Sequence, residues 1–139
     1  MTPRPLCRIA AGLLAFFAAA HTYGMLAPKE PTVQAAEVRA LMDSVHFDIT
    51  GLSRSYSDFY FGFGMLLSTF LVFSAWLAWR LGGLADGAPT LARPLLAGLA
   101  VTVVVVAAIC WRWFFIPPAA TATLAAVALA AAAARTGRR

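Results

Sequence analysis

The chain has 139 residues, of which 61% are hydrophobic and 12% are charged, and its formal net charge is +5. A soluble domain is about half apolar with about a quarter of its residues charged, so this composition excludes a water-soluble core and leaves no room for a separate soluble catalytic domain. The basic residues stand at the ends of apolar stretches, which is typical of topology signals and argues against a nucleic-acid partner.

The first apolar segment, residues 9–26, would form a helix of about 27 Å, just enough for a hydrocarbon core of about 30 Å. A cleaved signal peptide is the alternative, with Arg4 and Arg8 as its charged region and residues 18–20, three alanines, as its cleavage site. Apolar and aromatic residues continue as far as Leu26, which favours a retained span.

Pro28 and Pro31 end this first segment, and Thr32 is the expected N-cap of the next one. An amphipathic helix is predicted over about residues 32–46, either lying on the membrane surface or capping the bundle. Its apolar positions recur at helical spacing: Val38, Leu41, Met42, Val45 and Ile49.

Three further spans are predicted, at about residues 56–79, 94–113 and 117–134. Aromatic residues gather near the ends of the second and third spans, as in interfacial belts. Residues 82–83, two glycines, and residues 86–89 are expected to form the turn before the third span. The predicted fold is therefore an all-α membrane protein: one domain, 1–139, folded as a four-transmembrane-helix bundle with an amphipathic helix in its first extramembrane loop.

Basic residues are distributed unequally between the two predicted membrane faces. The face that holds both termini carries seven arginines, at positions 4, 8, 80, 93, 135, 138 and 139. The other face carries Lys29, Arg39, Arg54 and Arg112, together with most of the acidic residues. The positive-inside rule then predicts a multi-pass protein of the cytoplasmic membrane with both termini cytoplasmic.

Polar residues near the predicted outer face are the candidate ligand-binding site, because polar groups at membrane depth usually line a cavity or meet a partner. The candidates are His21, Tyr23, His46, Arg54, Asp58 and Tyr60. If Arg54 and Asp58 share a helix, their spacing of four places them on one face, where they can form an ion pair. This pair would either clamp the loop to the bundle or bind a headgroup or a quinone-like ring.

His21 and His46 could ligate haem if the loop helix folds back over the bundle, although a histidine near an interface more often serves hydrogen-bonded packing. No further Cys/His cluster favours a metal, so we expect neither a metal nor a resident cofactor. Cys7 and Cys110 lack the C-x-x-C spacing and should lie near opposite faces, too far apart for a disulfide.

Small residues form a stripe along the second predicted span, at Ser57, Gly64, Ser68 and Ala75. Such a stripe lets another helix approach closely. Gly64 and Ser68 are therefore predicted helix-packing residues. The partner helix would come either from the same bundle or from a second copy, in which case the protein would be a homo-oligomer.

The string Arg54-Ser55-Tyr56-Ser57-Asp58-Phe59-Tyr60-Phe61-Gly62-Phe63-Gly64, with His21-Thr22-Tyr23-Gly24 before it, resembles a family of small bacterial integral membrane proteins with four predicted spans. The likeness covers mainly the first eighty residues. It implies a bacterial origin and this fold, and it adds no mechanism because the family has no established activity.

These observations predict a non-enzymatic membrane protein that binds a hydrophobic small molecule or lipid, or acts as an accessory subunit of a larger membrane complex. The alternative is a small membrane enzyme with a lipid-soluble substrate. It would use His21 or His46 as acid or base and Asp58 as the orienting group, within a cluster that includes Arg54.

Overall fold

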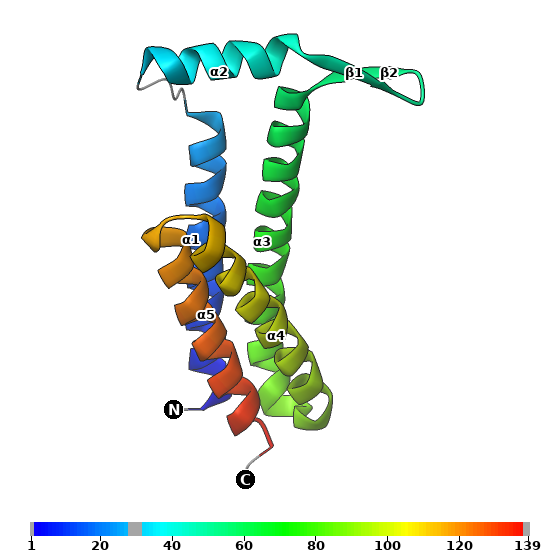
Figure 1. Ribbon diagram of the computed structural model, residues 1–139. Helices are drawn as coiled ribbons and strands as arrows, with labels where there is room; N and C mark the ends of the chain where they lie inside the picture. Colours follow the sequence, from blue (N-terminus) through cyan, green and yellow to red (C-terminus); the bar gives the residue numbers. More distant parts are fainter. Residues whose placement is uncertain (1, 28–31, 138–139) are drawn as a thin grey trace.

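The computed structural model describes residues 2–27 and 32–137 and confirms the helical bundle (Figure 1). In these residues the elements are α1 (Pro3–Leu26), α2 (Val33–Ser44), β1 (His46–Ile49), β2 (Leu52–Ser55), α3 (Tyr56–Gly87), α4 (Pro89–Trp113) and α5 (Ile116–Arg135). By length and composition, α1, α3, α4 and α5 are apolar enough to cross a membrane. The start of α1 and the end of α5 lie at the same end of the bundle, here called the terminal end (Figure 1).

Most of the buried residues of the bundle are small, and many large apolar side chains face outward. Helix α1 packs against α3 and α5, and α4 packs against α5 and α3. The buried residues of α5 are Ala119, Ala122, Ala125, Ala126, Ala128, Leu129, Ala132 and Ala133. Phe70, Trp76 and Val104 are among the large apolar residues on the outside. Small residues inside and large apolar ones outside are expected when helices pack closely in lipid.

Helix α1 is an integral part of this core. Cys7, Ala10, Leu14 and Phe17 are buried on it, against neighbouring helices. Removing α1 would uncover the faces of α3 and α5 that it contacts. Cys7 and Cys110 are both buried free thiols.

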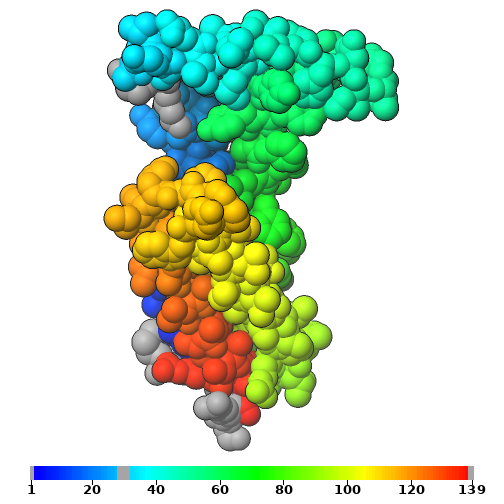
Figure 2. Space-filling view, in the orientation of Figure 1, coloured from blue at the N-terminus to red at the C-terminus, as the bar shows by residue number. Residues whose placement is uncertain are grey.

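Helix α2 and the β-hairpin form a crossbar over the far end of the bundle, opposite the terminal end (Figure 1). Thr32 is the N-cap, as expected: its hydroxyl accepts a hydrogen bond from the Ala35 N–H at 3.1 Å. No residue of α2 is buried, and Val38 and Leu41 are exposed. The space-filling view shows that α1 and α3 are visible between the crossbar and the α4–α5 connection (Figure 2).

The hairpin was not predicted, and helix α2 ends at Ser44, before the helical spacing of apolar residues reaches Ile49. That residue lies in β1 and pairs with Leu52 of β2 in antiparallel register. Thr50 and Gly51 connect the strands, with positive φ angles of 53° and 85°. A two-residue turn with both φ values positive matches the twist of a hairpin, which explains why the helix stops and the chain reverses here.

Three helices extend several residues beyond their predicted bounds at the terminal end, and α1 does so by beginning at Pro3 instead of residue 9. Helix α3 continues through Gly82 and Gly83 to Gly87, and α4 already begins at Pro89, with Pro94 inside it. Glycine costs only about 1 kcal/mol in a helix, so packing can override it. At Gly82 the reason is visible: a Cβ there would lie 2.8 Å from the Cys7 Cβ, so the close contact of α1 with α3 requires glycine.

Candidate functional site

The first polar group of the site lies between α1 and α3. The His21 Nδ1 atom is 3.0 Å from the Ser68 Oγ atom. The Thr22 Oγ1 atom is 2.9 Å from the same Ser68 oxygen, and the Thr22 hydroxyl donates to the Ala18 carbonyl oxygen at 2.8 Å. Ser68 is buried, and His21 and Thr22 are half-buried. We call these three side chains the His21–Thr22–Ser68 network, and it joins two helices in apolar surroundings, where a lost partner is costly.

The second polar group lies where the crossbar meets α3. The Asp58 carboxylate accepts from the Ser55 N–H at 2.9 Å, and the Ser55 hydroxyl accepts from the Asp58 N–H at 3.2 Å. This reciprocal pair is a capping box that starts α3. The Phe47 ring of β1 packs 5.1 Å from both the Tyr56 and the Phe59 ring centroids. Together these contacts fix the hairpin to the beginning of α3.

In the described residues, the Arg54 and Asp58 side chains form no ion pair, because the two residues do not share a helix. Helix α3 begins at Tyr56, so Arg54 belongs to β2 and does not share a helical face with Asp58. Its guanidinium instead donates to the carbonyl oxygen of its neighbour Ser53 at 2.8 Å. Asp58 is engaged by the cap and serves the local structure of the chain.

The predicted candidates therefore divide between two places. His46 pairs with Ser55 in the hairpin, and its Nδ1 atom is 3.0 Å from the Ser44 carbonyl oxygen. Ser55 precedes Ser68 by thirteen residues of α3, which is about 20 Å along a helix. His21, which contacts Ser68, is thus far from His46, and the two imidazoles do not face one haem position. No group of three or more His, Cys, Asp or Glu that could hold a metal occurs in the described ranges.

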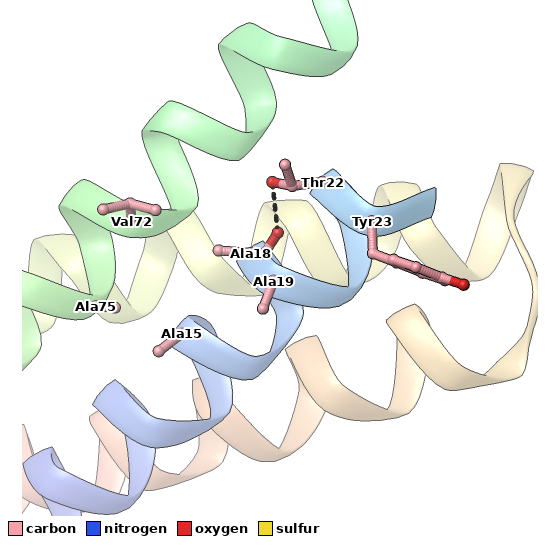
Figure 3. A pocket seen from close by; sticks show the side chains of 7 residues that line it. All are labelled: Ala15, Ala18, Ala19, Thr22, Tyr23, Val72 and Ala75. Atoms are coloured by element: carbon pink, nitrogen blue, oxygen red, sulfur yellow. Dashed lines mark hydrogen bonds between the residues drawn. The ribbon is translucent and has the colours of Figure 1, made fainter. Parts of the chain in front are cut away.

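A groove between α1 and α3 lies beside the His21–Thr22–Ser68 network (Figure 3). We call it the α1–α3 groove; its volume is about 370 Å³, and it is lined by Ala15, Ala18, Ala19, Thr22, Tyr23, Val72 and Ala75. Figure 3 shows Thr22 pointing toward α3, whereas the Tyr23 ring extends away from it. Tyr23 is 75% exposed and Tyr60 of α3 is 56% exposed. Thr22 is the lining residue that also belongs to the network.

The small-residue stripe of α3 faces α1. A Cβ at Gly64 would collide with the Met25 side chain, Ser68 contacts His21 and Thr22, and Ala75 is buried. The stripe is therefore covered within the same chain, and this leaves a second copy little access to Gly64 and Ser68. Sequence reasoning missed the groove, whose alanines carry no individual signal, and Thr22, which was seen only as a neighbour of His21.

The chain matches no protein-family model, no curated protein and no solved structure.

Proposed function

We propose that this protein is a non-enzymatic protein of the bacterial inner membrane that binds a lipid acyl chain, or a hydrophobic small molecule of similar shape, in the α1–α3 groove. The observation that carries the proposal is the groove itself, which is lined almost entirely by small apolar side chains. Ligand pockets are mostly apolar with few polar groups, and a narrow groove between membrane helices suits a flexible hydrocarbon chain.

The polar side chains near the groove support an apolar ligand. The Thr22 hydroxyl already donates to the Ala18 carbonyl oxygen, and Ser68 has two side-chain neighbours. A polar ligand would have to displace these hydrogen bonds, whereas a hydrocarbon chain would leave them intact. The enzyme alternative gains no support from His21, because Ser68, which His21 contacts, lies ten helical residues beyond Asp58, about 15 Å along α3.

Filling the groove should prevent the labelling of its walls by a photoreactive lipid. The probe is a phosphatidylcholine with a diazirine near the end of one acyl chain, reconstituted with the full chain and mapped by peptide mass spectrometry. Ala19 is exposed and lines the groove, so an Ala19→Phe variant should fold and lose most labelling of α1 and α3. Ala20→Phe is the matched control, because Ala20 is also exposed and does not line the groove. Equal loss in both variants, or labelling spread evenly over all four long helices, would contradict the proposal.

We further propose that the terminal end faces the cytoplasm, because the seven arginines assigned to that face outnumber the four basic residues of the crossbar face. A fluorescent reporter that matures only in the cytoplasm, fused after the last residue, should be active. A phosphatase reporter that works only outside the cytoplasm should be inactive at the same position and active when inserted at Gly51, the hairpin turn. The reverse pattern would overturn the orientation.

A further inference from the structure

A second groove lies at the terminal end, and its chemistry differs from that of the α1–α3 groove. It has a volume of about 620 Å³ and is lined by Arg4, Arg8, Leu77, Trp79, Arg80, Leu81, Gly83, Leu84 and Leu95. These residues come from α1, α3 and α4. The two grooves share no lining residue, so an inference about this one, here called the arginine groove, is independent of the proposed function.

Positive charge exceeds negative charge in the arginine groove. The Asp86 carboxylate lies 3.9 Å from the Arg4 guanidinium, which is 52% exposed. Within the described part of the chain, no carboxylate forms an ion pair with Arg8 or Arg80. The Arg8 guanidinium carbon instead lies 5.1 Å from the centroid of the Trp79 ring. This cation–π contact holds the guanidinium beside the groove while leaving its N–H donors able to bind an anion.

The remaining walls of the groove are apolar. Leu77, Leu81 and Leu84 come from α3, and Leu95 comes from α4. A site with guanidinium groups beside a leucine-lined surface suits a molecule that has an anionic oxygen group joined to hydrocarbon. Arginine binds phosphate oxygens through two parallel hydrogen bonds, and basic pockets between membrane helices are known to hold anionic lipid headgroups.

We propose that the arginine groove binds an anionic phospholipid, with its headgroup phosphate at Arg8 and Arg80 and an acyl chain along the leucines. The net charge selects an anionic lipid over a zwitterionic one, because a neutral headgroup would bring an ammonium group toward the arginines. Arg4 is partly neutralised by Asp86 and contributes less.

The test is a lipid titration of the gently solubilised full chain, followed by native mass spectrometry. Dioleoyl phosphatidylglycerol should bind more tightly than dioleoyl phosphatidylcholine, which has the same acyl chains. Arg8→Gln and Arg80→Gln should each weaken phosphatidylglycerol binding roughly fivefold, since each arginine near the headgroup contributes about that factor. Arg93→Gln is the matched control, because Arg93 belongs to the same arginine-rich face and does not line the groove. Asp86→Asn should strengthen binding, since it removes the competing carboxylate.

Three outcomes would overturn the proposal. The first is equal binding of the two lipids, which would mean that the groove does not distinguish headgroups by their charge. The second is a loss in Arg93→Gln as large as that in Arg80→Gln, which would indicate general surface charge. The third is full displacement of the lipid by soluble glycerol 3-phosphate, which would show a site for free phosphate. The Asp86→Asn gain gives a readout that an unfolded variant cannot mimic.

Discussion

Replacing Gly82 with alanine should destabilise the bundle, although alanine is the better helix former. The added Cβ would lie 2.8 Å from the Cys7 Cβ and 3.4 Å from the Arg4 carbonyl oxygen. The first atom is a Cβ and the second is a backbone oxygen, and both are fixed to α1. The steric clash can therefore be relieved only if the two helices separate. Overpacking of this kind costs about 1–3 kcal/mol, against a helix-propensity gain of about 1 kcal/mol. We expect a net loss of up to about 2 kcal/mol in the free energy of unfolding in mixed detergent micelles.

Gly83→Ala is the matched control for this prediction, because a Cβ at Gly83 meets no atom within 4 Å. It should be neutral or slightly stabilising. A Cys7→Gly change made together with Gly82→Ala removes the Cβ atom with which the new alanine clashes. The double variant should recover part of the lost stability, and a double-mutant cycle would measure this coupling. If Gly82→Ala and Gly83→Ala behave alike, α1 and α3 do not approach as closely as described.

The four spans could be predicted because apolar length is a property of the sequence alone. The stretch of residues 94–113 has one charged residue, Arg112, and is long enough to cross a membrane, and α4 contains it. Helix ends were harder to place, because glycine and proline signal a turn only when packing does not override them. Gly82 shows this: the feature that predicted a turn is required by the contact of α3 with α1.

The hairpin could not be predicted from periodicity alone. Val45 and Ile49 are spaced four apart, which fits a helix, while the strands that follow Ser44 are only four residues each. Thr50-Gly51 was the available signal, although it is weaker than the Asn-Gly or Asp-Gly pairs that mark such turns. Once the chain reverses there, Arg54 lies in a strand, and for this reason the expected pairing with Asp58 failed.

The sequence singled out two residues of the His21–Thr22–Ser68 network, but it did not indicate the α1–α3 groove, where Tyr23 is the one lining residue among the predicted ligand-binding candidates. Ser68 was recognised as a packing residue and His21 as a polar residue of the first span, but their contact depends on how α1 and α3 are rotated and shifted against each other. Sequence spacing within one helix does not contain that information. The arginines of the second groove were interpreted only as topology signals, because their common position with four leucines is a tertiary property.

Replacing Ser68 with alanine should have the second large effect. The change removes the hydroxyl that faces both the His21 Nδ1 atom and the Thr22 hydroxyl, and with it the side-chain hydrogen bonding between α1 and α3. A side-chain hydrogen bond contributes about 0.5–1.5 kcal/mol net, which exceeds the small gain from burying a methyl group. We expect a loss of that size in the free energy of unfolding, measured by denaturation in mixed detergent micelles.

Thr69→Ala is the control, because the Thr69 hydroxyl is exposed and donates to the Met65 carbonyl oxygen of its own helix at 2.9 Å. It removes a hydroxyl from the adjacent position without touching α1, and its effect should stay within about 0.5 kcal/mol. Equal effects of the two variants would mean that the His21–Thr22–Ser68 network does not hold the helices together. A large effect confined to Ser68→Ala would instead make the network the polar anchor that fixes α1 against α3, and with it the width of the α1–α3 groove beside it.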